Sequence, residues 1–182
     1  MTNATPAARV WPRRGSVLGV GLLGGSVGMS LRRHNIYVTG YSRRQSGCDS
    51  AVKAGAIDAG FTDVRQACEG SDVVVIASPV NKIAELAVVA HESIGPAVDG
   101  DVPFVTDVGS TKKRIIDELD SLCPAAAERF VAAHPIAGSE KTGGENASED
   151  LFDDKVVILT PTSRVLSTLR GRAEQFWRIT GA

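Results

Sequence analysis

The chain has 182 residues, enough for one domain or for one domain and a small part of another. Hydrophobic residues make up 43% and charged residues 23% of it, a balance that excludes disordered, collagen-like and disulfide-stapled proteins. Lys and Arg total 20 against 21 Asp and Glu, so the formal net charge of −1 gives no global attraction to nucleic acid or to an anionic membrane. The three cysteines are scattered, which favours reduced thiols in a cytoplasmic protein.

Nothing at the start of the chain indicates a targeting signal or a membrane anchor. Residues 1–14 contain arginines but no apolar segment, and we interpret them as a disordered leader before a single domain at 15–182. The apolar stretch at 17–31 contains several glycines and is too short to cross a bilayer. We therefore expect neither a membrane nor a nucleic acid as a partner.

Strand and helix patterns alternate along the chain. Strands are predicted at 15–20, 36–41, 73–77, 104–107, 130–133 and 156–159, and helices up to residue 33 and at 45–54, 83–90, 111–119 and 164–179. The run at 73–77 is continuously apolar, as expected for a strand buried on both faces of a parallel sheet. Ser110 is the expected N-cap of the helix at 111–119, and the polar segment at 139–154 is expected to be a surface loop. The alternation predicts an α/β fold with a doubly wound, mostly parallel sheet.

A glycine-rich turn follows the first predicted strand and opens the first predicted helix. Its sequence, GVGLLG, fits the pattern GxGxxG, with Gly19, Gly21 and Gly24 as the glycines and Leu22 and Leu23 before the last one. The first glycine permits a tight turn, the second lets the backbone approach a pyrophosphate, and the third lets helix and strand pack closely. Because the turn lies between a strand and a helix of a βαβ unit, it predicts dinucleotide binding.

The end of the second predicted strand indicates which dinucleotide binds. NAD-binding units usually place an acidic residue there, to bond the ribose 2′-hydroxyl. This chain has Ser42, Arg43 and Arg44 instead. A serine hydroxyl can donate to a 2′-phosphate and arginine can bind it in bidentate fashion, so the sequence favours NADP over NAD. The alternative is a solvated pair of arginines at a helix start.

Two further motifs lie at the carboxyl ends of predicted strands, where open α/β sheets bind ligands. DVGSTK contains Ser110, and HPIAGSEKTG begins with His134. An enzyme that oxidises an alcohol with a nicotinamide cofactor needs a group to accept the hydroxyl proton as hydride leaves, and histidine is the usual choice near neutral pH. His134 is therefore the candidate base, and Ser110 could hold the imidazole or the substrate hydroxyl. The alternative is a structural histidine at a strand end; no metal site is predicted.

The segments VLGVGLLGGSVGMSLRR, DVGSTK and above all HPIAGSEKTG resemble the prephenate/arogenate dehydrogenases of tyrosine biosynthesis, from about residue 17 to the C-terminus. The resemblance implies an NAD(P)-binding Rossmann domain and a small-molecule substrate, prephenate or arogenate, that is oxidised at its ring hydroxyl with loss of the ring carboxylate. It implies that His134 takes the proton of the ring hydroxyl and that Ser110 contacts both this hydroxyl and His134. The other matched positions are Ser139 and Glu140 at the substrate pocket, and Ser78, Pro79 and Val80 at a cofactor-contacting turn.

The resemblance also implies a helical C-terminal domain that is missing from this chain. In the family that domain forms a homodimer and supplies an arginine for the substrate carboxylate. We therefore expect the isolated chain to be inactive and the homodimer to form in the full-length protein. Two alternatives stay open: another NADP-dependent oxidoreductase, of the β-hydroxyacid dehydrogenase or imine reductase type, and a non-catalytic module that senses NADP.

Overall fold

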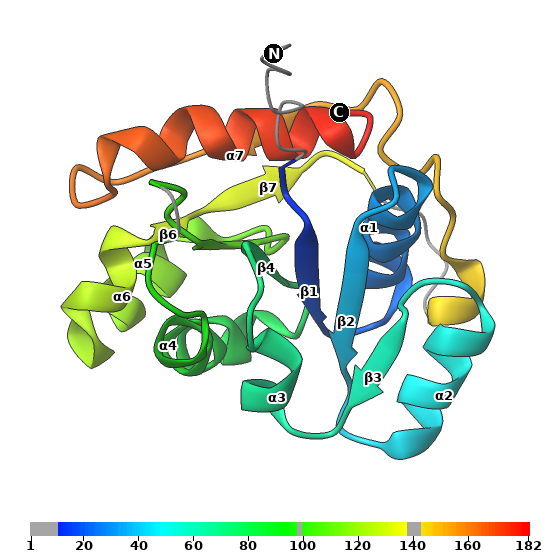
Figure 1. Cartoon of the computed structure of the whole chain (residues 1–182). Coiled ribbons are helices and arrows are strands. Elements are labelled where there is room, and N and C mark those ends of the chain that lie inside the picture. Colours follow the sequence, from blue (N-terminus) through cyan, green and yellow to red (C-terminus); the bar gives the residue numbers. More distant parts are fainter. Residues whose placement is uncertain (1–10, 98–99, 138–142) are drawn as a thin grey trace, which may run out of the picture.

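A parallel six-stranded sheet forms the centre of the molecule (Figure 1). The computed structural model describes residues 11–97, 100–137 and 143–182. The strands of the sheet are β1 (Arg14–Leu18), β2 (Tyr37–Tyr41), β3 (Ala59–Phe61), β4 (Val73–Ile76), β5 (Phe104–Asp107) and β6 (Phe130–Val131). They lie in the order β3-β2-β1-β4-β5-β6, and each neighbouring pair is parallel. The predicted doubly wound, Rossmann-like sheet is confirmed.

Helices cover both faces of this sheet. They are α1 (Leu22–Arg33), α2 (Gln45–Lys53), α3 (Val64–Cys68), α4 (Ile83–Ser93), α5 (Lys112–Leu122), α6 (Pro124–Glu128) and α7 (Ser167–Ile179), with short 3-10 turns η1 (Val80–Lys82) and η2 (Gly144–Asn146). Buried residues of α1 and α7 belong to one hydrophobic cluster, and those of α3, α4, α5 and α6 belong to another. None of the described helices has the length and apolar character needed to cross a lipid bilayer.

The side chains of the central strands explain why both faces are covered. In β4, Val73 and Val75 belong to the cluster with α1 and α7, whereas Val74 and Ile76 belong to the cluster with α3 to α6. All four side chains are fully buried. A strand that is apolar on both faces is stable only between two helical layers, so the continuous apolar run predicts the architecture as well as the strand.

The chain leaves the main sheet after β6. The next strand, β7 (Ala133–Pro135), pairs antiparallel with β8 (Val157–Leu159) in a separate two-stranded sheet. The single strand predicted at 130–133 is therefore wrong, because two short strands in different sheets occupy this region. His134 lies opposite Ile158 in the β7–β8 pairing.

The start of α5 differs from the prediction. Its N-cap is Thr111, whose side chain makes no capping hydrogen bond, so the prediction of Ser110 as N-cap is wrong. The turn before the helix is held instead by Asp107, whose Oδ2 accepts the Gly109 N–H at 2.9 Å. The Ser110 side chain is exposed, and Ser110 is not the cap of the helix.

Part of the predicted surface loop at 139–154 packs against the domain. The Ser148 N–H donates to Ser26 Oγ on α1 at 3.0 Å. Phe152 is fully buried and meets the Trp177 ring edge-on, with centroids 5.9 Å apart. The described part of this segment is thus an anchored element that rests on α1 and α7.

The domain begins before residue 15. β1 starts at Arg14, and Trp11 stacks on the buried ring of Phe104 with centroids 6.1 Å apart. The Arg172 guanidinium of α7 lies over the Trp11 indole, 4.6 Å from its centroid. The leader predicted at 1–14 is therefore wrong for residues 11–14, which pack on the sheet and on α7.

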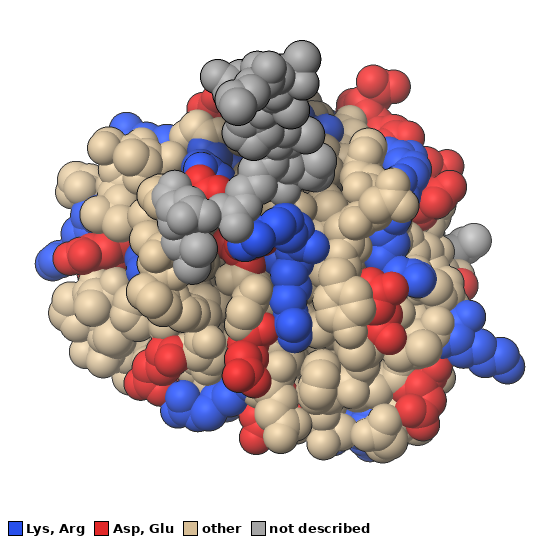
Figure 2. Space-filling view, viewed as in Figure 1, with Lys and Arg blue, Asp and Glu red and all other residues tan. Residues whose placement is uncertain are grey.

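Charged side chains of both signs are interspersed on the face drawn in Figure 2. Some charged side chains of the molecule form ion pairs between segments distant in sequence. Arg32 Nε lies 2.9 Å from Asp58 Oδ1, and Arg33 Nη2 lies 3.1 Å from Asp153 Oδ1.

Replacing Phe176 tests the packing of α7 on the sheet. This side chain is fully buried and meets the rings of Phe104 and Trp177 edge-on, at centroid distances of 6.2 and 5.3 Å. We expect Phe176→Ala to lower the free energy of unfolding by about 3–5 kcal/mol, because it removes a buried ring and leaves a cavity. Urea denaturation measures the change, with Leu122→Ala as control because Leu122 is 54% exposed. Equal losses in the two variants would contradict the packing.

Candidate functional site

Most of the residues predicted to form the site follow strands of the parallel sheet. Gly19 follows β1, Ser42 follows β2, Ser78 comes shortly after β4, and Ser110 comes shortly after β5. The carboxyl ends of parallel strands lie at one edge, so the fold brings these residues to the same edge of the sheet. The strand order changes direction between β1 and β4, the point at which open α/β sheets bind ligands.

Packing fixes two of the three glycines in the loop and leaves the third beside open space. Gly19 has a φ of 108°, and a Cβ there would lie 2.5 Å from the Ala77 carbonyl oxygen. A Cβ on Gly24 would lie 1.9 Å from the Gly19 carbonyl oxygen. A Cβ on Gly21 would meet no atom within 4 Å, and Gly21 caps α1 without a side-chain hydrogen bond. The start of α1 is therefore accessible to an anionic ligand.

The predicted cofactor turn after β4 lies beside this loop. Ser78 Oγ donates to the Leu18 carbonyl oxygen at 2.8 Å, which joins the turn to the end of β1. Pro79 is exposed, and Val80 begins η1 and packs against the hydrophobic core. The two leucines of the glycine loop, Leu22 and Leu23, begin α1, and Leu23 packs against the core.

A cavity of about 710 Å³ lies between the glycine loop and α2. Small and hydroxyl-bearing residues predominate in its lining, among them Gly21, Ser42, Ser46, Gly47 and Ser50. A Cβ on Gly47 would lie 2.3 Å from Ser42 Oγ, so the lack of a side chain at Gly47 leaves room for that hydroxyl. Ser42, at the end of β2, therefore lines the cavity with its hydroxyl.

Arg43 and Arg44 are exposed where β2 leads into α2, and neither lines the cavity. Arg44 is the N-cap of α2 but makes no side-chain capping bond, and the first turn of this helix contains no acidic residue. Within the part of the chain that the structure describes, neither guanidinium has an ion-pair partner. Two exposed guanidinium groups at a helix start without a side-chain cap give this point a positive potential suited to an anion.

One wall of the cavity comes from a segment to which the sequence assigned no definite role. Gly144 and Glu145 of η2 line it, together with Val20 of the glycine loop. A Cβ on Gly144 would lie 2.7 Å from the Val20 carbonyl oxygen, so the backbone of η2 rests directly on the loop. The adjacent glycines at 143 and 144 were the signal in the sequence that could have indicated this close approach.

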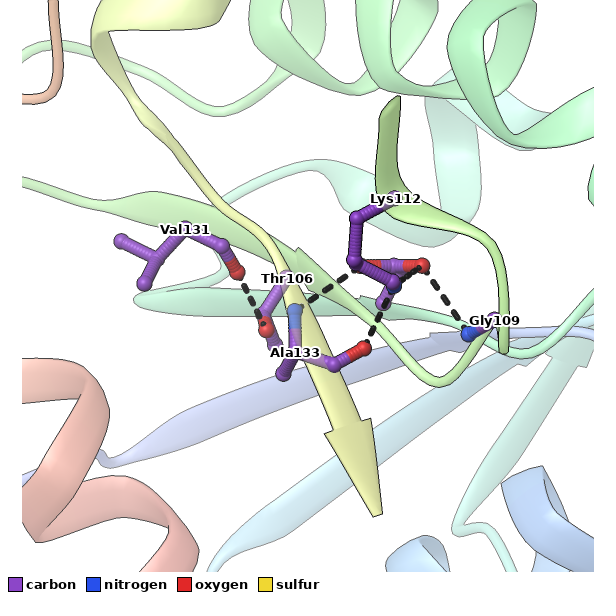
Figure 3. Close-up of polar contacts among 6 residues, drawn as sticks. Thr106, Gly109, Lys112, Val131 and Ala133 are labelled. Carbon is purple, nitrogen blue, oxygen red and sulfur yellow. Dashed lines mark hydrogen bonds and ion pairs between the residues drawn. The ribbon is translucent and has the colours of Figure 1, made fainter. Parts of the chain in front are cut away.

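Asp107 and Lys112 form a buried ion pair at the carboxyl end of β5 (Figure 3). Asp107 is fully buried, the Lys112 side chain is 13% exposed, and 2.5 Å separates Lys112 Nζ from Asp107 Oδ2. Asp107 Oδ1 accepts the Ala133 N–H at 3.0 Å, and Lys112 Nζ donates to the Ala133 carbonyl oxygen at 2.6 Å. One ion pair therefore holds both polar groups of the Ala133 backbone.

Burial opposes the charge on both members of this pair. It raises the pKa of Asp107, although the charge of Lys112 and the N–H donors of Gly109 and Ala133 act in the opposite direction. Burial likewise lowers the pKa of Lys112, against the charge of Asp107. Neither residue was assigned a role from the sequence; the available signal was an acidic residue that ends a buried strand, followed by a lysine in the same motif.

The ion pair also links the segments that carry the two predicted catalytic residues. Ser110 lies between Gly109 and Lys112, both of which bond to Asp107, and His134 directly follows Ala133. His134 is half-buried on β7. The other predicted substrate-pocket residues, Ser139 and Glu140, lie outside the described residues. Among the residues described, no group of three or more His, Cys, Asp and Glu side chains could hold a metal ion.

The chain matches a family model described as the nucleotide-binding domain of prephenate dehydrogenase, over residues 27–182. A prephenate dehydrogenase from Bacillus subtilis (strain 168) is 33% identical over 146 residues, which cover 79% of this chain and 38% of that protein. The solved structure of prephenate dehydrogenase from Aquifex aeolicus with hydroxyphenyl propionate and NAD+ is 31% identical, with a TM-score of 0.82, and the match covers 96% of this chain and 59% of that one.

A second solved structure, the arogenate dehydrogenase of Synechocystis, is 27% identical with a TM-score of 0.81; the match covers 93% of this chain and 57% of that one. The chain spans 38–55% of the length of the curated relatives it matches. The similarity therefore concerns one part of those longer proteins.

Alanine at two glycines tests whether packing or open space surrounds the loop. We expect Gly24→Ala to lower the free energy of unfolding by about 1–3 kcal/mol, because its Cβ would collide with the Gly19 carbonyl. Gly21→Ala should change it by no more than about 0.5 kcal/mol, since no atom stands in the way. Urea denaturation of both variants gives the comparison. A Gly21→Ala protein as unstable as Gly24→Ala would show that the space at Gly21 is not open.

Proposed function

This chain belongs to the prephenate dehydrogenase family, as its nucleotide-binding domain, and we propose that it carries the cofactor site and the catalytic base of an enzyme that oxidises and decarboxylates prephenate or arogenate in tyrosine biosynthesis. The observation that carries the proposal is the arrangement at one sheet edge. The glycine loop lies at β1, and the segments that carry Ser110 and His134 are tied together beside β5. This arrangement supports a site in which a dinucleotide and a base meet at the same edge of the sheet.

The proposed chemistry needs little acid–base machinery from the protein. The nicotinamide of a bound cofactor supplies the hydride acceptor. His134 accepts the proton of the ring hydroxyl as hydride leaves the ring carbon that bears this hydroxyl, and Ser110 holds the hydroxyl by a hydrogen bond. The ring carboxylate leaves as carbon dioxide, its electron pair completes the aromatic ring, and the phenolic oxygen takes a proton back from His134. Formation of the aromatic ring makes the step effectively irreversible.

We further propose that the cofactor is NADP in preference to NAD. The end of β2 presents the Ser42 hydroxyl beside two exposed arginines, and no carboxylate occupies the first turn of α2. A carboxylate at this point would repel a 2′-phosphate, whereas guanidinium groups bind one. The Aquifex aeolicus relative is solved in complex with NAD+, a cofactor of the same nicotinamide dinucleotide class.

The remaining proposals concern the complete enzyme and rest on the family resemblance. The relatives are longer than the matched region, and we propose that a segment like their remaining part completes the substrate site and forms a homodimer. On this view the 182-residue chain binds the cofactor without turning over substrate. We also place the enzyme in the cytoplasm.

Replacing Arg43 tests the cofactor preference. We expect Arg43→Ala to weaken NADP binding by about ten- to a hundredfold, because it removes a charge-assisted contact with the 2′-phosphate, and to leave NAD binding unchanged. Ser42→Asp should reverse the preference, since its carboxylate can accept from a free 2′-hydroxyl and repels phosphate. Calorimetric titration of both cofactors measures each affinity.

A variant of the glycine loop provides the matched control for cofactor preference. Gly21→Ala places a methyl group at the open start of α1, so it should weaken NADP and NAD by the same factor. Equal affinity of the wild-type chain for the two cofactors would refute the NADP proposal. An equal loss of both from Arg43→Ala would do so too.

Replacing His134 tests the assigned base. In the full-length enzyme proposed above, we expect His134→Asn to lower kcat by about 10²–10⁴-fold, the usual contribution of a positioned general base. Cofactor affinity should stay unchanged, because the glycine loop lies at β1 rather than β7. His34→Asn, at the C-cap of α1, is the control and should retain full activity. Near-normal turnover by His134→Asn would remove this residue from the mechanism.

A further inference from the structure

We infer that the buried Asp107–Lys112 pair is a positioning device that sets the place of His134 relative to Ser110, an inference that rests on the catalytic role proposed above for His134. Asp107 is fully buried, and the Lys112 side chain, 13% exposed, directs its Nζ to Asp107 Oδ2 and to the Ala133 carbonyl oxygen. The pair therefore acts through the backbone and is distinct from the groups that would touch substrate.

The contacts of the pair reach the peptide bond of His134 itself. The Ala133 carbonyl, which accepts from Lys112 Nζ at 2.6 Å, shares one planar peptide unit with the His134 N–H. The preceding peptide unit is held as well, since the Ala133 N–H donates to Asp107 Oδ1 at 3.0 Å. Two consecutive peptide planes are thus fixed just before the imidazole-bearing residue, which leaves its backbone little freedom (Figure 3).

The position of β7 relative to β5 depends on these contacts because β7 is not a strand of the main sheet. Its ladder runs only to β8, through three residue pairs, in the described part of the chain. The preceding strand β6 has two residues, and one side-chain bond, from Thr106 Oγ1 to the Val131 carbonyl oxygen at 2.7 Å, supports its junction with β5. The ion pair supplies the connection that a longer ladder would otherwise give.

The same carboxylate holds the Ser110 side of the site. Asp107 Oδ2 accepts the Gly109 N–H at 2.9 Å and also binds Lys112, so it brackets Ser110 on both sides. One buried carboxylate thereby fixes the position of the segment that carries Ser110 relative to the segment that carries His134. The distance between the two catalytic side chains then follows from the fold and needs no hydrogen bond between them.

Nuclear magnetic resonance of the three histidines tests the inference without relying on turnover. In the 182-residue chain, the imidazole Cε1–Hε1 signal of His134 is assigned by its loss in His134→Asn. Spectra are recorded at a pH of about 8.5, where unperturbed histidines are neutral, so that changes in protonation do not contribute. We expect Lys112→Met to shift and broaden the His134 signal and to leave the signals of His34 and His91 in place.

Matched variants separate positioning from charge and from general damage. Lys113→Met removes the same charge from the next residue of α5, whose side chain is 88% exposed, and should move none of the three signals. The double variant Asp107→Asn/Lys112→Met keeps the net charge, avoids an uncompensated buried carboxylate and should still shift and broaden the His134 signal. Lys112→Arg, which keeps the donor and the charge, should restore a sharp signal. An unperturbed His134 signal in the folded double variant would overturn the inference.

Kinetics then connects the device to the proposed reaction. In the full-length enzyme proposed above, the double variant should lower kcat by about a hundredfold, because a reacting group misplaced by about 1 Å costs about that much in rate. The KM for the cofactor should stay unchanged. A displaced His134 signal with unchanged kcat would refute the catalytic role of His134 and leave the structural clamp standing. An undisturbed signal with full loss of activity would refute the clamp and leave the proposed function standing.

Discussion

A carboxylate removed from water needs donors around it, and Asp107 finds them in three different segments. The Gly109 N–H comes from the turn after β5, the Lys112 ammonium from α5, and the Ala133 N–H from β7. An unpaired buried charge is so costly that loss of one partner from such a pair typically costs about 3–5 kcal/mol. One buried carboxylate therefore joins the three segments, and the candidate catalytic residues Ser110 and His134 lie next to the groups that it binds.

The β1 side of the same edge is fixed by a different constraint, the close contact of backbone with backbone. A Cβ on Gly19 would collide with the Ala77 carbonyl oxygen, and a Cβ on Gly24 would collide with the Gly19 carbonyl oxygen. These close contacts hold the glycine loop near β4 without any charge. The two halves of the candidate site are thus held by separate interactions, steric contacts for the glycine loop and an ion pair for the segments that carry Ser110 and His134. A change in one half leaves the interactions that hold the other half intact.

Local sequence patterns predicted the central elements well because those elements are determined by local chemistry. The all-apolar β4 and the glycine start of α1 can be read without knowledge of their neighbours. The short elements β3, α3 and α6 were missed, since three to five residues carry too little periodicity. The division between β6 and β7 was missed because the pairing partner, β8, lies far along the chain. The anchor at Phe152 was missed because two adjacent apolar residues, Leu151 and Phe152, among polar neighbours form no periodic pattern.

The candidate site shows the same limit in its chemistry. Asp107 ends β5 and Ser110 follows it, both at the ligand-binding edge of the sheet. From the sequence alone, either residue type is suited to contact a ligand. Burial separates them: Ser110 is exposed, whereas Asp107 is fully buried and satisfied by protein donors. At this edge the exposed polar residues are those able to meet a ligand, and the buried ones hold the segments that carry them. His134 lies between these two cases, because its side chain is half-buried and the carbonyl of the residue before it accepts a hydrogen bond from Lys112.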